Sequence, residues 1–252
     1  MDAVILAGGK GTRMGPLSEE LPKPLVQICG VPIIKYLIDY YIYWGVKRIL
    51  ICCGYRYQDF FSYIGTLGKR LYIEQQTIIA VIFNGCEIIA VNTGEETGTG
   101  GRIKRVKEFI NTKRFFLTYG DGLSDVDLKA LCSQHEQANN IVTLTAVHPM
   151  SKFGVLQLDN HLQINCFYEK GPLANVWING GYMVVDEQIY DYIESDSTSL
   201  ERDCFPKLVS DGKIGVFQHL GIWQCMDTIE ERNLLELLVK QERLPWNRHE
   251  IY

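Results

Sequence analysis

Short apolar runs rich in β-branched residues alternate along this chain with stretches whose apolar positions recur at helical spacing. The first run, at residues 3–7, is apolar throughout, which is typical of a central strand covered on both faces. Further strands are predicted at 47–53, 77–83, 87–91, 115–118 and 141–147, and helices at 32–44, 58–67 and 127–138. This alternation predicts an α/β fold in which helices cover a largely parallel sheet.

The pattern changes after about residue 150. Apolar runs at 153–158, 162–168 and 181–185 predict strands of a more antiparallel region, and helices are predicted at about 199–210 and 227–241. No stretch has the composition of a linker, and no repeat is present. We therefore expect a single domain over residues 1–252, with a lobe at about 150–185 and a C-terminal helical segment at about 227–252.

Composition and charge exclude several classes of partner. The 252 residues carry a net charge of −5, so no basic field attracts nucleic acid or an anionic membrane surface. No apolar run approaches the ~20 residues needed to span a bilayer. The eight cysteines form no C-x-x-C pair, and several lie within apolar runs, as reduced cysteines do. These features predict a cytoplasmic protein. If it has a phosphate ligand, that ligand must be held by a local site.

A glycine-rich loop, Gly8-Gly9-Lys10-Gly11-Thr12-Arg13, follows the first strand directly. Glycines let backbone N–H groups approach a phosphate chain closely, and Arg13 adds forked donors suited to phosphate oxygens. Ten residues later Lys23 stands between two prolines, which restrict where its ammonium can lie. A dinucleotide fingerprint would need a third glycine where Met14 stands, and no segment matches a Walker loop. The loop therefore indicates a phosphate-binding site of another kind.

Two aspartates are candidate metal ligands. Asp121 lies between two glycines where a predicted strand ends, which is where open α/β sheets bind ligands. Asp227 lies at the start of the last predicted helix, where it is also a candidate N-cap. Magnesium takes few protein ligands when it shares phosphate oxygens, so two carboxylates suffice. A second pair, Asp125 and Asp127, could hold a nucleotide-sugar metal, although acidic residues here suit the start of the helix at 127.

Residues 6–14 (Leu-Ala-Gly-Gly-Lys-Gly-Thr-Arg-Met) and 22–26 (Pro-Lys-Pro-Leu-Val) together resemble the signature of the sugar nucleotidyltransferases. The loop at 93–106 and the segments 51–55, 119–122 and 244–246 resemble the glucose-1-phosphate cytidylyltransferase branch of that family. The resemblance spans residues 2 to about 246. It implies a Rossmann-like three-layer α/β/α mixed sheet of the glycosyltransferase-A-like type, Mg²⁺ as cofactor, CTP and glucose 1-phosphate as substrates, and a homo-oligomer.

The resemblance also implies a role for each matching site residue. Arg13 and Lys23 are expected to be catalytic, and Asp121 and Asp227 to bind the metal. Nucleotide binding is expected from Leu6, Ala7, Gly8, Gly9, Lys10, Gly11, Thr12, Arg13, Lys23, Thr97, Arg102 and Gly120. Sugar-phosphate binding is expected from Tyr119, Glu169, Lys170, Asn179 and Gly180. The family usually has proline where this chain has Gly171, which leaves the sugar open.

Three functions are compatible with these features. In the first, the sugar phosphate attacks the α-phosphorus of a nucleoside triphosphate (CTP, or else dTTP, UTP or GTP) in line, and no side-chain nucleophile is needed. The second is a metal-dependent glycosyltransferase acting through Asp125 and Asp127, which would not need Arg13 and Lys23. The third is a non-catalytic subunit, which should have lost charged site residues that this chain retains.

Overall fold

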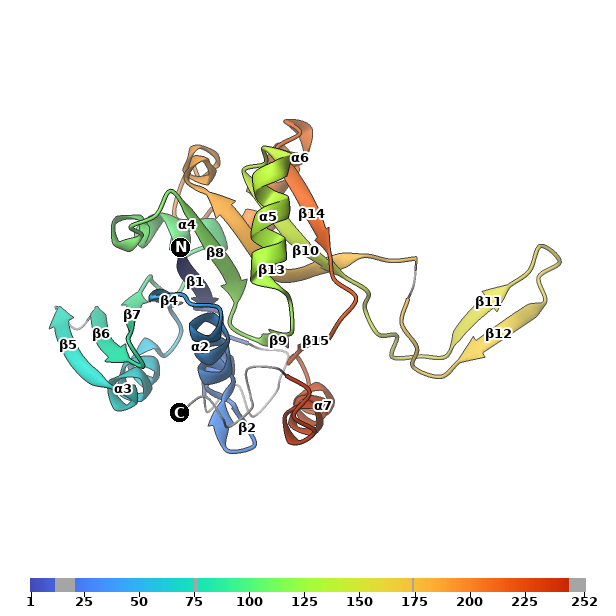
Figure 1. Ribbon diagram of the computed structural model, residues 1–252, viewed down its shortest axis with the longest axis horizontal. Coiled ribbons are helices and arrows are strands. Elements are labelled where there is room, and N and C mark those ends of the chain that lie inside the picture. Colours follow the sequence, from blue (N-terminus) through green and yellow to red (C-terminus); the bar gives the residue numbers. More distant parts are fainter. Residues whose placement is uncertain (12–20, 75–76, 174, 245–252) are drawn as a thin grey trace.

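The computed structural model describes residues 1–11, 21–74, 77–173 and 175–244. Over these residues, nine strands form one mixed sheet with helices on both sides (Figure 1). In spatial order the strands are β14 (Ile214–Gln218), β10 (Val142–Val147), β13 (Ile178–Asp186), β8 (Arg114–Tyr119), β1 (Asp2–Ala7), β4 (Arg48–Cys53), β7 (Cys86–Asn92), β6 (Ile78–Phe83) and β5 (Lys69–Glu74).

The centre of the sheet is parallel, antiparallel strands lie on both sides of it, and the edge strand β14 pairs in parallel with β10. Strand β1 pairs in parallel with β4 and β8, and β4 pairs in parallel with β7. Strand β13 runs antiparallel between β8 and β10, and β6 runs antiparallel between β7 and the edge strand β5. The predicted parallel sheet and the more antiparallel region after residue 150 are both confirmed.

Two separate hydrophobic cores show that the sheet is covered on both faces. Along β1, Ala3, Ile5 and Ala7 belong to one core, and Val4 and Leu6 belong to the other. The first core includes residues of α2 (Ile33–Tyr43), α3 (Tyr57–Leu67), α5 (Leu128–Ala138) and α7 (Ile229–Lys240). The second includes residues of α4 (Thr99–Arg105), η4 (Glu187–Tyr192), η5 (Leu200–Cys204) and α6 (Phe205–Ser210). The predicted three-layer α/β/α architecture is confirmed.

An extended arm, residues 150–172, projects from this body (Figure 1). Strands β11 (Val155–Leu158) and β12 (Ile164–Tyr168) pair only with each other in an antiparallel ribbon. Several large apolar side chains of the arm are exposed, and Phe153 and Leu162 are each 79% exposed. Part of the lobe predicted at about 150–185 is therefore an arm that leaves much of its apolar surface uncovered, whereas the last part, in β13, belongs to the main sheet.

Several elements, most of them short, were not predicted from the sequence. The strands β2 (Gln27–Ile28), β3 (Val31–Pro32), β5, β9 (Gly122–Ser124), β14 and β15 (Trp223–Cys225) were not predicted, nor were the single turns η2 (Lys23–Leu25) and η3 (Lys107–Phe109). The helix predicted at 199–210 is divided into the π-helical η5 and the α-helical α6, because Pro206 at the start of α6 lacks a backbone N–H donor. Among the described residues, no helix has the length and hydrophobicity to span a bilayer.

Candidate active site

A cavity of about 820 Å³ opens where the parallel strands β1 and β8 end. The carboxyl ends of such strands are where open α/β sheets place their ligands. Most of the predicted site residues line the cavity: Leu6, Ala7, Gly8, Gly9, Lys10, Gly11, Lys23, Thr97, Arg102, Tyr119, Gly120, Asp121 and Asp227. Thr12 and Arg13 lie outside the described residues.

Arg102 forms the floor of the cavity beneath the glycine-rich loop. It is 4% exposed, whereas the three neighbouring basic residues, Lys104, Arg105 and Lys107, are exposed. Its guanidinium donates to five oxygens: the carbonyls of Gly8, Cys53, Gly94 and Glu95 and the hydroxyl of Thr93. No carboxylate forms an ion pair with Arg102 within the described part of the chain, and burial lowers its pKa.

These hydrogen bonds join three segments that are distant in sequence: the glycine-rich loop, the end of β4, and the loop before α4. A Cβ atom on Gly8 would lie 2.0 Å from Nη1 of Arg102, so only glycine fits beside the guanidinium. Since the donors of Arg102 are directed at the protein, its main contribution is to shape the cavity that it lines.

The loop at 93–101, which carries the predicted nucleotide-binding residue Thr97, contacts the glycine-rich loop. Thr97 lines the cavity there, and Lys10 lies 3.1 Å from a carboxylate oxygen of Glu95 and 2.8 Å from one of Glu96. Gly98 and Gly100 donate backbone hydrogen bonds to the carbonyls of Asp196 and Thr198. The loop is thus held on one side by Arg102 and on the other by the segment before η5.

Lys23 meets both predicted metal ligands. It lies in η2, is 6% exposed, and its Nζ is 2.6 Å from Asp121 and 2.5 Å from Asp227. Strand β9 follows Asp121, β15 precedes Asp227, and the two strands pair so that Gly122 lies opposite Cys225. This pairing brings the two aspartates together.

The two carboxylates fit a divalent cation. Both reach a single ammonium group, so their oxygens already converge on one positive charge. Carboxylate oxygens are the hard ligands that Mg²⁺ prefers. The alternative role of Asp227 as an N-cap is wrong, because Thr228 caps α7 in a capping box with Glu231.

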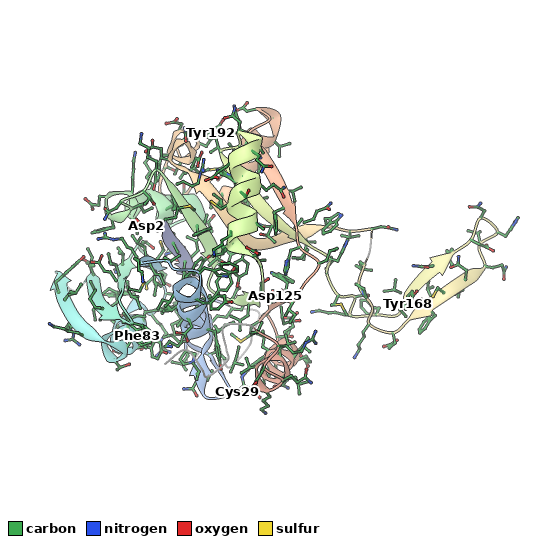
Figure 2. The ribbon with its side chains drawn as sticks, in the orientation of Figure 1. Asp2, Cys29, Phe83, Asp125, Tyr168 and Tyr192 are labelled. Atoms are coloured by element: carbon green, nitrogen blue, oxygen red, sulfur yellow. The ribbon has the colours of Figure 1, made fainter. Side chains whose placement is uncertain are left out.

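The predicted sugar-site residues are divided between the cavity and the arm. Tyr119 lines the cavity, Asn179 Nδ2 donates to its hydroxyl at 3.4 Å, and the Gly180 carbonyl accepts from the indole of Trp223. Glu169 and Lys170 are exposed and follow Tyr168, which Figure 2 shows on the arm, away from the side chains packed on the sheet. The structure does not bring this pair to the cavity of its own chain.

Residues that the sequence analysis missed form a further wall of the cavity. Thr99, Ser197, Ser199 and Arg202 line it; Ser197 and Ser199 belong to the segment that leads into η5, and Arg202 lies in η5 itself. The run Ser-Asp-Ser-Thr-Ser at 195–199 has ordinary loop composition. The only sequence feature that could indicate a binding role is its high content of hydroxyl groups. No pattern within the run predicts that it lies beside α4.

The second aspartate pair has structural partners. Asp127 caps α5 by accepting from the backbone N–H groups of Lys129 and Ala130, as expected for a helix start. Asp125 accepts from the backbone of Ile222 at 2.6 Å and lies 2.9 Å from His219. Neither residue lines the cavity, so this pair gives no support to a glycosyltransferase site.

Comparison with known proteins agrees with this geometry. The family model described as "Nucleotidyl transferase" matches residues 2–231. The chain is 34% identical over 258 residues to the glucose-1-phosphate cytidylyltransferase of Salmonella typhi, with 99% of this chain and 100% of that protein covered. It is also 34% identical to the probable glucose-1-phosphate cytidylyltransferase of Bacillus subtilis, with 94% of each chain covered.

Solved structures share the fold. HddC from Yersinia pseudotuberculosis superposes with a TM-score of 0.70 at 26% identity, with 94% of this chain and 98% of that chain covered. The inositol-1-phosphate CTP transferase of T. maritima gives a TM-score of 0.68 at 19% identity, with 100% and 97% covered, a likeness of fold alone. Because the family model covers nearly the whole chain and the cavity carries the glycine-rich loop, the lysine and the paired aspartates, this protein belongs to the nucleotidyl transferase family and is a nucleotidyltransferase.

Proposed function

We propose that this enzyme joins CTP to α-D-glucose 1-phosphate and releases CDP-glucose and pyrophosphate. The observation that carries the proposal is the convergence of Lys23, Asp121 and Asp227 in one cavity with the glycine-rich loop. The whole-length similarity to glucose-1-phosphate cytidylyltransferases supports CTP and glucose over other nucleotides and sugars. The same reaction with dTTP, UTP or GTP, or with another sugar 1-phosphate, is the alternative.

The proposed chemistry needs positioning and charge more than covalent help. A phosphate oxygen of the sugar 1-phosphate attacks the α-phosphorus of CTP in line, a new P–O bond forms, and the bond from the α-phosphorus to the leaving pyrophosphate breaks. Mg²⁺ held by Asp121 and Asp227 would supply neutralising charge at the reacting phosphates. Lys23 draws the phosphates of both substrates together, Arg13 stabilises the leaving pyrophosphate, and backbone N–H groups of the glycine-rich loop hold the triphosphate.

A pyrophosphate-release assay tests the function. CTP, UTP, dTTP and GTP are crossed with several sugar 1-phosphates, and the highest kcat/KM is expected for CTP with glucose 1-phosphate. CTP failing with every sugar would contradict the proposed nucleotide. Consumption of a nucleotide-sugar without any pyrophosphate would instead favour a glycosyltransferase, against which the hydrogen bonds of Asp125 and Asp127 argue.

We also propose that the chain is one catalytic domain, acts in the cytoplasm, and assembles with copies of itself through the arm. Its eight cysteines are free thiols, as expected in a reducing compartment. The arm exposes apolar side chains. It also carries Glu169 and Lys170, which are predicted to bind the sugar phosphate but lie away from the cavity of their own chain. A second copy is therefore the occupant that we propose for this surface.

Light scattering coupled to size-exclusion chromatography measures the assembly. The protein is expected at a multiple of 28.8 kDa, and Phe153→Glu on the arm is expected to lower that mass because it places a charge in an apolar contact. Leu220→Glu is the matched control, since Leu220 is 80% exposed and lies outside the arm. A monomeric wild-type protein would contradict the proposed assembly.

A further inference from the structure

A carboxylate with no part in the proposed reaction is hydrogen-bonded to one wall of the cavity. Glu201, in η5, accepts three side-chain hydrogen bonds: from the Tyr119 hydroxyl at 2.5 Å, the Thr99 hydroxyl at 2.7 Å and the Ser199 hydroxyl at 2.7 Å. Each of these three donors lines the cavity. They come from the end of β8, the start of α4 and the segment before η5, so one carboxylate connects three parts of the wall.

A negative charge at this position is unfavourable for binding, because both substrates carry several negative charges. The three hydroxyl donors compensate for it within the protein. Although burial opposes it, the hydrogen bonds from Tyr119, Thr99 and Ser199 hold the pKa of Glu201 below its ordinary value. The side chain is therefore an acceptor at neutral pH.

The ionised carboxylate fixes the direction of the neighbouring hydrogen bonds. A tyrosine hydroxyl has one proton, and that of Tyr119 is directed at Glu201, so its oxygen is left as an acceptor. The side-chain amide of Asn179 donates to this oxygen at 3.4 Å, and its Oδ1 accepts from the backbone N–H of Gly181 at 2.9 Å. A chain of hydrogen bonds with one direction thus runs from β13 through Asn179 and Tyr119 to Glu201.

We propose that Glu201 is a positioning residue for the sugar 1-phosphate: by holding the protons of Tyr119, Thr99 and Ser199, it presents the Tyr119 oxygen as an acceptor to a hydroxyl group of the sugar. The inference rests on the proposed function. It adds to the sugar subsite one further residue, Glu201, and the direction of one hydrogen bond, in which the Tyr119 oxygen accepts. It places hydroxyl donors of the sugar, rather than its phosphate, beside Tyr119. The carboxylate that is hydrogen-bonded to this wall keeps the charged phosphate of the sugar away from it.

Steady-state kinetics of Glu201→Gln tests the proposal, since glutamine keeps the shape of the side chain and removes the charge. The KM for the sugar 1-phosphate is expected to rise about tenfold, the effect of losing one well-oriented hydrogen bond, while the KM for the nucleotide changes less than about twofold. Tyr119→Phe is expected to raise the same KM, and the double variant is expected to be no worse than Tyr119→Phe, because Glu201 acts through Tyr119. Glu194→Gln is the matched control on the neighbouring segment; its carboxylate pairs with Lys207 outside the cavity.

An unchanged sugar KM in a folded Glu201→Gln protein, or additive effects in the double variant, would overturn the inference while leaving the nucleotidyl transfer reaction in place. If Glu201→Gln does not fold, Tyr119→Phe decides alone. An unchanged sugar KM in that variant would show that the sugar does not bind the Tyr119 oxygen, which is the acceptor that Glu201 is proposed to orient. A wild-type enzyme that releases no pyrophosphate with any substrate pair refutes the proposed function first, so the two failures are distinguishable.

Discussion

Replacing Lys23 with methionine is expected to lower kcat by about a hundred- to a thousandfold, the loss measured when one preorganised charge is removed from a reacting centre. The ammonium is buried and touches both Asp121 and Asp227. Burial alone would lower the pKa of Lys23, but the two carboxylates outweigh it and raise the pKa above 10.5. The ammonium therefore stays charged at neutral pH, and its contribution to stability is lost only as the pH rises through that raised value.

The same substitution has a second consequence that needs no substrate. Without the ammonium, Asp121 and Asp227 face each other as two like charges, so Lys23→Met is expected to have a lower Tm than wild type in the presence of a chelator. A divalent cation restores the missing charge, so Mg²⁺ is expected to raise the Tm of the variant more than that of wild type. Thermal melts with and without Mg²⁺ measure the difference.

Lys35→Met is the matched control for both measurements. Lys35 also pairs with an aspartate, Asp39, one turn away on α2, and it does not line the cavity. Its loss is expected to leave kcat unchanged and to change the stability by less than about 1 kcal/mol. Wild-type turnover in Lys23→Met, or a stability that responds to Mg²⁺ as wild type does, would contradict the role assigned to Lys23.

Arg102→Met is expected to destabilise the fold by about 3–5 kcal/mol, because it removes the hydrogen bonds by which one guanidinium joins three segments. Loss of these contacts also releases the glycine-rich loop from the loop that holds Thr97, so the KM for the nucleotide should rise in whatever protein remains folded. Urea denaturation measures the first effect, and initial rates at varied CTP measure the second. Arg102→Lys is expected to recover only part of the stability, since one ammonium cannot replace a five-donor fork.

Arg105→Met controls for the loss of a cation from the same helix. Arg105 is 42% exposed in its side chain and pairs with Asp196 at the surface, so its removal is expected to cost less than about 1 kcal/mol. Equal losses of stability in the Arg102 and Arg105 variants would show that Arg102 does not join the segments as its contacts indicate.

Much of the fold follows from local patterns in the sequence. The apolar run of β1, the helix of α2 ending before Gly45, and the Asp127 cap of α5 all depend on interactions within a few residues, and the structure agrees with each to within one or two positions. The glycine-rich loop and Lys23 were also identified locally, from steric freedom in one case and from flanking prolines in the other. Such features are encoded over distances that periodicity and turn chemistry describe.

Contacts between residues that are distant in the sequence could be determined only from the tertiary structure. Lys23 lies 98 and 204 positions from the aspartates that it contacts, and the strands that join them, β9 and β15, have three residues each, too few for a periodic signal. Arg102, one of four neighbouring basic residues, is buried because the carbonyl groups of three segments surround it, and Glu201 is joined to Tyr119 across 82 positions. The sequence alone predicted which residues bind phosphate. Long-range packing determined which side chains they meet, because burial and pairing depend on segments that the local pattern does not contain.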